Sequence, residues 1–236
     1  MFGRDAGYLE LAADYDKVLR ARNVLLRQAQ ERPLPTAQLG DLLAVYDQQL
    51  AGLGARVTAA RRSLVDDLRP RVIEAFAAIF RADLAVDVRY QVAAELPEGT
   101  DVAALEAALH AGLTAGRSRD LARGATSIGP HRDDLSFRFE GRDAGDFASQ
   151  GQLRSLILAW KTAELRLLTE VHQDAPILLL DDVSSELDPD RNAYLFEHLA
   201  TLAGQCIVTT TDPRHVLFTG DDRTDYRVHA GVVARA

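Results

Sequence analysis

The second half of the chain alternates between two patterns of apolar residues. Over Gln150–Val171 the apolar positions recur every three or four residues, which is the period of an amphipathic helix. The run Ile177–Leu180 is short and continuously apolar, as in a strand buried within a parallel sheet. A second helix pattern covers Pro189–Leu202, and a second strand pattern covers Gln205–Thr210. We therefore predict an α/β fold in which parallel strands alternate with flanking helices.

The first part of the chain has mainly helical patterns. Tyr8–Arg32 is amphipathic and ends before two prolines, at positions 33 and 35. Thr36 can cap a second helical stretch, and the helical pattern continues to about Phe80. A further helix is predicted over Asp101–Ala122. Residues of low helix propensity interrupt the second stretch, so we expect two or three helices there rather than one rod; they are Gly52, Gly54 and Pro70.

Strand patterns also occur outside the α/β half. Val86–Val92 alternates between apolar and polar residues, and Leu135–Phe139 does the same before a turn at Gly141. A final strand is predicted at Tyr226–Val233. We divide the chain into a helical subdomain with one or two strands, residues 1–125, and an α/β part, residues 126–236.

Composition narrows the class of protein. A chain of 236 residues that is 47% hydrophobic can bury a sizeable core. It has neither an apolar run near the length of a membrane span nor a signal-peptide pattern. The single cysteine, Cys206, falls in a predicted core strand and is expected to be a packed thiol, in a soluble protein of the reducing cytoplasm. The formal charge of −8 argues against a uniformly basic nucleic-acid-binding surface.

Two adjacent carboxylates end the first predicted parallel strand. Asp181 and Asp182 directly follow the apolar run, and open α/β sheets bind ligands beyond the carboxyl ends of their strands. Concentrated negative charge at that point suits Mg²⁺ and phosphate chemistry. The alternative is structural: the aspartates begin a solvated turn or cap the helix near Pro189.

An anion site is predicted about thirty residues upstream. Ser149 or Gln150 lies near the N-cap of the predicted helix, and Gly151 allows a ligand to approach the backbone. The first free amides of a helix form a ready anion site.

The order and spacing of these segments resemble a known family. Ser149–Gln152 is similar to the signature loop of ATP-binding-cassette (ABC) ATPases, and Pro176–Asp188 is similar to their Walker B strand and D-loop. With Gly129–Asp134 (Gly-Pro-His-Arg-Asp-Asp) and Thr209–Asp212 (Thr-Thr-Thr-Asp), the set resembles RecF, a bacterial recombination mediator. Tyr8–Gln30 also resembles a helical segment of RecF. The resemblance implies the C-terminal part of an ABC-type ATPase sheet with a helical subdomain on its N-terminal side.

The phosphate-cradling loop of such ATPases is absent from this sequence. There is no Gly-x-x-x-x-Gly-Lys-[Ser/Thr], and the only lysines are Lys17 and Lys161. In RecF this loop belongs to an N-terminal lobe, so the chain resembles the second lobe alone. A truncated gene product, an intentionally shortened chain and a separate polypeptide that pairs with its missing lobe all agree with the sequence.

The resemblance implies roles for individual residues, with ATP and Mg²⁺ as cofactors once a Walker A lobe is present. Asp181 would hold Mg²⁺, and Asp182 would stand where most ABC ATPases have the glutamate that activates water. Because aspartate is shorter, we expect slow hydrolysis, and none by this chain alone. The remaining nucleotide-facing residues would lie at an ATP-dependent homodimer interface; they are Ser149, Gln150, Gly151, Gln152, Ser185, Asp188 and Thr211, the last standing in for a switch histidine.

The implied macromolecular partners are DNA at duplex–single-strand junctions and mediators of the RecO and RecR type. Candidate DNA-contacting residues lie in a stretch with few acids and in the block that follows it; they are Arg117, Arg119, Arg123, His131 and Arg132. His131 is equally a candidate for a structural role, with Asp133 or Asp134 as its local partner. Arginines of the first two helical stretches, such as Arg22 and Arg27, are interspersed with acids and favour a solvated face. Two alternative functions remain open: another ATPase of the chromosome-maintenance class, and an interaction module that does not hydrolyse ATP.

Overall fold

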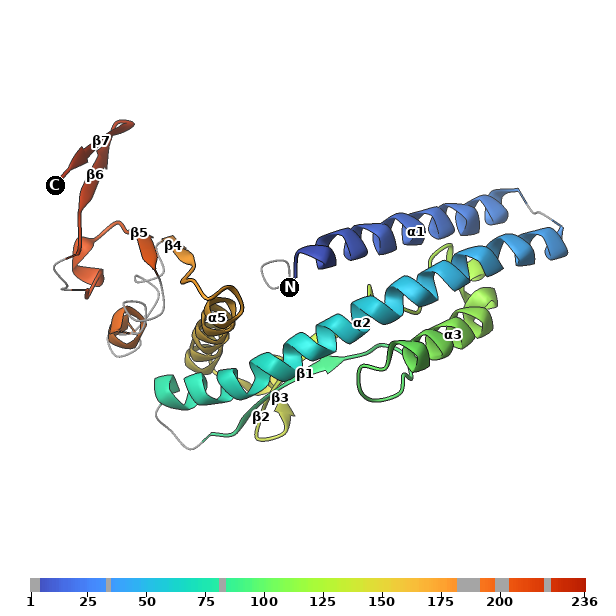
Figure 1. The fold of residues 1–236 in the computed structure, drawn as a ribbon, viewed down its shortest axis with the longest axis horizontal. Helices are drawn as coiled ribbons and strands as arrows, with labels where there is room; N and C mark the ends of the chain where they lie inside the picture. The colour runs from blue at the N-terminus through green and yellow to red at the C-terminus, as the bar shows by residue number, and fades with distance from the viewer. Residues whose placement is uncertain (1–4, 33–34, 81–83, 182–191, 198–203, 219–221) are drawn as a thin grey trace.

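Three long helices form an elongated arm. The computed structural model describes residues 5–32, 35–80, 84–181, 192–197, 204–218 and 222–236. Within the arm, α1 (Ala6–Glu31) and α3 (Val102–Arg123) both pack on α2 (Thr36–Phe80), and α1 also contacts α3. Figure 1 shows α1 and α3 lying along the N-terminal half of α2. The buried apolar side chains of α1 recur at helical spacing and face this contact: Tyr8, Leu11, Tyr15, Leu19 and Leu26.

The helix α2 is a single helix of 45 residues, so the expectation of two or three helices is wrong. Gly54 is a packing residue, because a Cβ atom there would lie 3.3 Å from side-chain atoms of both Leu109 and Tyr15. Pro70 lies inside the helix, where proline costs about 3 kcal/mol relative to alanine. Its neighbours Leu68 and Val72 are buried in the core, and this packing offsets the local penalty.

A small antiparallel sheet joins the arm to the rest of the molecule. Its strands are β1 (Val86–Gln91), β2 (Asp134–Phe139) and β3 (Arg142–Asp143), in that order, with Gly141 in the turn at φ 76°. Both predicted longer strands are therefore confirmed. The strand β1 pairs with β2 over its whole length, so segments on either side of residue 125 share one core. The division into residues 1–125 and 126–236 stays a prediction.

The α/β part begins with α4 (Ala144–Phe147) and α5 (Gln150–His172). The strands β4 (Ile177–Asp181) and β5 (Gln205–Thr209) follow and pair in parallel, as predicted. A short 3₁₀ helix, η2 (Pro213–His215), comes after β5. Residues 192–197 are helical, and the remainder of the predicted helix Pro189–Leu202 lies outside the described residues.

The parallel strands are less buried than predicted. Ile177 is 65% exposed and Leu179 is 71% exposed, whereas the alternate residues Leu178 and Leu180 pack against the core. In the described part of the chain only β4 and β5 pair in this sheet, so one of its faces lies open. The Cys206 side chain is exposed as well, although it lies on the same face of the sheet as Leu178 and Val208, and the prediction of a packed thiol is wrong.

The C-terminal segment is a hairpin rather than one strand. The strands β6 (Tyr226–His229) and β7 (Val232–Arg235) pair with each other around Ala230 and Gly231. Both turn residues have positive φ, 49° and 79°, which is the backbone geometry of a tight two-residue hairpin turn. The periodicity of the sequence located this segment but did not show the turn within it.

Candidate functional site

Ser149 forms the N-cap of α5 with a complete capping box. The Gln152 N–H donates to Ser149 Oγ at 3.2 Å, and the Ser149 N–H donates to Gln152 Oε1 at 2.7 Å. Reciprocal bonding of this kind fixes the entry of the chain into the helix. Ser149 keeps its hydroxyl hydrogen for a further acceptor, because Oγ acts only as an acceptor in the box.

The start of α5 leaves backbone donors facing outward. Gln150 is exposed and Gly151 is half-buried, and the Gly151 carbonyl accepts a bond from Ser155 Oγ at 3.0 Å. Among the described residues, the Gln150 and Gly151 N–H groups bond to no other atom. These amides and the positive end of the helix dipole can bind an anion such as a phosphate.

Asp181 stands at the carboxyl end of β4, opposite Thr209 at the end of β5. The Thr209 hydroxyl donates to Asp181 Oδ1, which orients the carboxylate at this edge of the sheet. No group of three or more acidic, His or Cys side chains that could hold a metal occurs among the described residues. Mg²⁺ in nucleotide sites uses one or two carboxylates together with substrate phosphates, so the single Asp181 carboxylate fits a shared ion.

The other predicted nucleotide-facing residues differ in where they lie and in whether the structure describes them. Thr211 is exposed two residues beyond β5, at the same sheet edge as Asp181. Thr210, beside it, is engaged in a turn with Asp212, because its Oγ1 donates to the Asp212 carbonyl at 3.0 Å. The remaining members lie outside the described residues: Asp182, Ser185 and Asp188.

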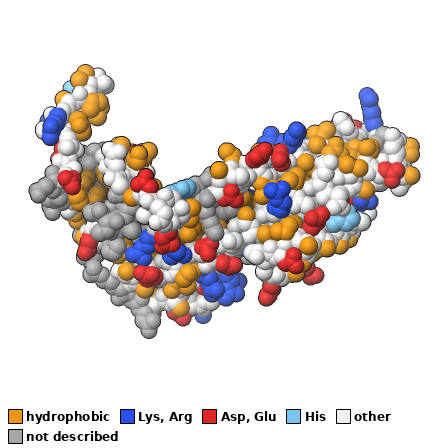
Figure 2. All heavy atoms as spheres, in the orientation of Figure 1, with side chains coloured by type: hydrophobic (Ala, Val, Ile, Leu, Met, Phe, Trp, Pro, Cys, Tyr) orange, Lys and Arg blue, Asp and Glu red, His pale blue; other side chains and the backbone are white. Residues whose placement is uncertain are grey.

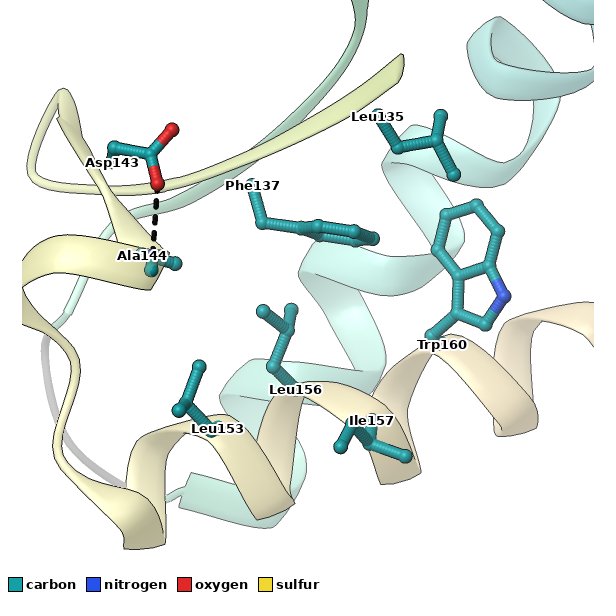
Figure 3. Close-up of a pocket in the computed structure, with 9 residues that line it drawn as sticks. Leu135, Phe137, Asp143, Ala144, Leu153, Leu156, Ile157 and Trp160 are labelled. Atoms are coloured by element: carbon teal, nitrogen blue, oxygen red, sulfur yellow. Dashed lines mark hydrogen bonds between the residues drawn. The ribbon is translucent and has the colours of Figure 1, made fainter.

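A cavity of about 460 Å³ adjoins the start of α5 (Figure 3). Leu135 and Phe137 of β2 point toward α5, where Phe137 meets the Trp160 ring edge-on at a centroid distance of 5.5 Å. Among the described residues that line it, Asp143 is the charged one, and it accepts the Gly145 N–H at 2.8 Å. The cavity is thus apolar and unsuited to phosphate, and the sequence did not predict it.

His131 is held in the Gly-Pro-His-Arg-Asp-Asp turn by two bonds. Its Nε2 lies 3.1 Å from the Thr126 carbonyl and therefore carries the proton, while Nδ1 accepts from the Tyr15 hydroxyl at 2.7 Å. Burial is the main cause that lowers the pKa of His131, and the Arg132 charge lowers it further. Its partners are thus Tyr15 and a carbonyl, and the expectation of a bond to Asp133 or Asp134 is wrong.

The same turn is fixed from its other side by α2 and β1. Arg61 donates through Nη1 to the Pro130 carbonyl at 2.6 Å, and the Tyr90 hydroxyl donates to Asp133 Oδ2 at 2.7 Å. Gly129 has φ 130°, and a Cβ atom there would collide with the Tyr15 hydroxyl. The turn is therefore a rigid part of the junction between arm and sheet.

A buried charge network crosses the arm and was missed by the sequence analysis. Arg22 is fully buried and donates to Asp47 at 2.8 Å and to Asp120 at 2.7 Å. Thr126 accepts a third bond at 2.9 Å. Arg117, a candidate for DNA contact, instead points its Nε at Asp47, 2.7 Å away. The available signal was the position of Arg22 within the apolar stripe of α1, between Leu19 and Leu26.

The other basic candidates are at the surface. Arg119, Arg123 and Arg132 are exposed, and Arg132 Nη2 rests 3.2 Å from the Thr126 carbonyl. Figure 2 shows acidic and basic side chains intermingled on the visible face of the arm, as the net charge suggests. No helix in the described part of the chain is long and apolar enough to cross a membrane.

Solved structures show which class of protein has this arrangement. The structural neighbours of this chain are RecF structures, and RecF is an ABC-type ATPase. A solved structure described as the recombination mediator protein RecF-ATPrS in the RecFOR pathway matches 98% of this chain and 59% of its own, with TM-score 0.85 and 30% identity. A RecF-ATP structure of that pathway matches with TM-score 0.83, 30% identity and 99% and 59% coverage.

Curated relatives carry the name DNA replication and repair protein RecF. The protein from Myxococcus xanthus is 42% identical over 240 residues, which covers 99% of this chain and 61% of the relative. That from Geobacter sulfurreducens is 38% identical over 234 residues, with the same two coverages of 99% and 61%. No family model matches the chain. The chain therefore resembles the C-terminal part of a RecF protein and spans about 61% of the length of such relatives.

Proposed function

We propose that this chain supplies the signature and Walker B half of an ATP-dependent DNA-repair ATPase of the RecF type. The observation that carries the proposal is the succession of a Ser149-capped helix, α5, and a parallel strand, β4, that ends at Asp181. RecF relatives named for DNA replication and repair, and RecF structures named with ATP, support the same assignment.

In the proposed mechanism, the chain binds a nucleotide that a P-loop of another lobe presents. The Ser149 hydroxyl and the amides of Gln150 and Gly151 donate to the γ-phosphate, and the Gln152 side chain keeps Ser149 in place. The nucleotide then joins two protomers, and its hydrolysis releases them. Asp182, Ser185 and Asp188, outside the described residues, and Thr211 would complete the site.

Asp181 would hold Mg²⁺ together with the phosphates, and the ion would neutralise phosphate charge as the bond to the leaving group breaks. The Thr209 hydroxyl orients the carboxylate by donating to Oδ1. A shorter carboxylate at position 182 predicts slow turnover, which suits a timed clamp better than a motor.

The open face of the parallel strands supports a requirement for a second lobe. Ile177, Leu179 and Ile207 are 65%, 71% and 51% exposed, although each belongs to a central strand pattern. Covering three such side chains would contribute about 1.5–3 kcal/mol for each one fully buried. We infer that a Walker A lobe of the RecF type covers this face.

The broader role is also a proposal. The assembled ATPase would act in the cytoplasm, bind DNA near duplex–single-strand junctions and help to load recombinase with RecO- and RecR-type partners. RecF structures described as belonging to the RecFOR pathway support this role.

The test is ATP hydrolysis and ATP-dependent dimerisation of the chain with and without a P-loop lobe from a RecF protein. We expect activity only in the mixture. Asp181→Asn should abolish Mg²⁺-dependent turnover, whereas Asp174→Asn, an exposed carboxylate just before β4, should leave it unchanged. Turnover that survives Asp181→Asn in the mixture would contradict the assignment.

A further inference from the structure

Two groups of arginines can be distinguished in and beside the arm. Members of the first have carboxylate partners; they are Arg20, Arg22, Arg69, Arg71, Arg89 and Arg117. Members of the second are exposed and have no ion pair with any described residue; they include Arg27, Arg119, Arg123 and Arg132. An exposed arginine without an acidic partner can offer guanidinium donors to an external anion, although Arg132 already directs Nη2 at the Thr126 carbonyl, 3.2 Å away.

The second group borders one seam of the arm, where the segment 121–131 runs beside α1. Gln30 Nε2 donates to the Leu121 carbonyl at 2.7 Å, and the Thr126 N–H donates to Asn23 Oδ1 at 2.8 Å. Farther along, the Tyr15 hydroxyl bonds to His131. These contacts, at three points of α1, place the segment along the helix.

The unpaired arginines lie at both ends of this seam. A Cβ atom on Gly124 would lie 3.1 Å from Arg27 Cγ, so Arg27 stands beside the residue that follows Arg123. Arg119 is one turn before Arg123 on α3. At the other end, Arg132 follows the residue that Tyr15 holds. Together, Arg27, Arg119, Arg123 and Arg132 form a row that we call the arginine seam.

The length of the arginine seam suits a nucleic-acid strand. Tyr15 and Arg27 are twelve positions apart on α1, which corresponds to about 18 Å of helix. A duplex carries one phosphate charge for about every 1.7 Å of its axis, so a seam of this length is long enough to meet more than one phosphate.

Two carboxylates that neighbour seam arginines in the sequence, Asp120 and Asp133, accept hydrogen bonds from other groups. Asp120 accepts from Arg22 at 2.7 Å and from Ser127 Oγ at 2.6 Å, and it is buried. Asp133 accepts from Tyr90 at 2.7 Å and from the Ala93 N–H at 2.9 Å. Asp120 is therefore compensated by Arg22 beside Arg119 and Arg123, whereas Asp133 keeps its charge beside Arg132, so positive charge is greatest around Arg27, Arg119 and Arg123.

We propose that the arginine seam binds the phosphate backbone of DNA without reading its sequence. The proposal rests on the proposed role in DNA repair and names the surface that makes the contact. It also separates the basic residues of this region by role: Arg117 and His131 hold the structure of the arm, whereas the seam arginines contact phosphate.

The experiment is fluorescence anisotropy of a labelled duplex with the chain alone, without nucleotide, between about 50 and 200 mM salt. Each phosphate contact contributes about 0.9 to the slope of log K against log salt. Arg27→Gln, Arg123→Gln and Arg132→Gln should each reduce the slope by about 0.9, and the triple variant by about 2.7. Arg56→Gln, at an exposed arginine on α2, is the matched control and should leave the slope unchanged.

The proposal would be contradicted if the unaltered chain did not bind the duplex at the lowest salt, or if the slope in the triple variant were unchanged. Tighter binding of polyglutamate than of the duplex at equal salt would also contradict it. A thermal melt of each variant shows that the exposed substitutions leave the fold intact. Because no ATP is present, a failure here leaves the proposed nucleotide half-site standing. Conversely, failure of the mixed-lobe ATPase test leaves the seam standing.

Discussion

The arm and the parallel strands differ in how completely their side chains are satisfied. In the arm, the fully buried Arg22 has two carboxylates and a threonine as partners, although its Nη2 atom has none among the described residues, and a rigid turn closes the junction. At the parallel strands, apolar side chains that fit a central sheet lie exposed, and Asp181 stands at an open edge. The contrast agrees with the proposal that another lobe completes the strand edge, whereas the centre of the arm is packed within this chain.

The largest effect is expected at the buried centre of the arm. Arg22→Ala would leave Asp47 and Asp120 buried without their shared partner, which costs about 3–5 kcal/mol of unfolding free energy. Urea unfolding measures the change. The control is Arg20→Ala, which removes a largely exposed pair with Asp16 and should cost about 1 kcal/mol or less. Equal losses in the two variants would contradict a closed network.

A smaller loss is expected at the rigid turn. Gly129→Ala introduces a side chain at φ 130° against the Tyr15 hydroxyl and should cost about 2 kcal/mol or more. Gly40→Ala is the matched control, because a Cβ atom there meets nothing within 4 Å and α2 is helical. That control should stabilise the chain by about 0.5–1 kcal/mol. Loss of stability in both variants would contradict a specific requirement for glycine at position 129 of the turn.

The His131 contact predicts a pH dependence. Because its pKa in the folded chain lies below the ordinary value of about 6.5, the unfolded chain binds the proton first on acidification. Stability should therefore fall as the pH drops below about 6.5, and His131→Gln should flatten the curve in that window. Thermal melts from about pH 7.5 to 5.5 test the sign. A gain in stability toward acid would contradict the neutral, Nε2-protonated ring.

The smallest effect on stability is expected on the open strands. Leu179→Thr changes a side chain that is 71% exposed, so unfolding free energy should change by about 0.5 kcal/mol or less. The same variant should bind a P-loop lobe more weakly, which sedimentation of the mixture measures. Leu109→Thr, in the core of the arm, should have the opposite pattern. It should lower stability strongly without a specific loss of binding to the P-loop lobe. An unimpaired mixture with Leu179→Thr would argue against a covering lobe on this face.

Local patterns were sufficient to predict much of the fold. The helix period located α1, α3 and α5, and the capping residue of α5 was narrowed to Ser149 or its neighbour, because capping depends on residues close in sequence. The parallel pairing of β4 and β5 followed from the order of elements. The prediction of two or three helices over residues 36–80 failed because it depended on distant contacts. Pro70 and Gly54 are tolerated in α2 because of packing partners that the sequence does not reveal.

The same limit applies to the sites. Asp181 was predictable because an apolar strand ends there, whereas the partners of Arg22 lie 25 and 98 residues away. Arg117, Arg119 and Arg123 belong to one short stretch, yet one faces Asp47 and the others face outward, a difference that only the orientation of α3 decides. Exposure of Cys206 likewise depends on which strands neighbour β5.

Amide hydrogen exchange tests the contrast between a closed arm and an open strand edge most directly. In the chain alone, we expect strong protection of the amides of α1, α2 and α3 and weak protection of those of β4 and β5. With an added P-loop lobe and ATP, protection should rise in β4, β5 and the first turn of α5, and stay unchanged in the arm. Strong protection of β4 and β5 in the chain alone, with no increase in the mixture, would contradict the account of a half-site that awaits its complement.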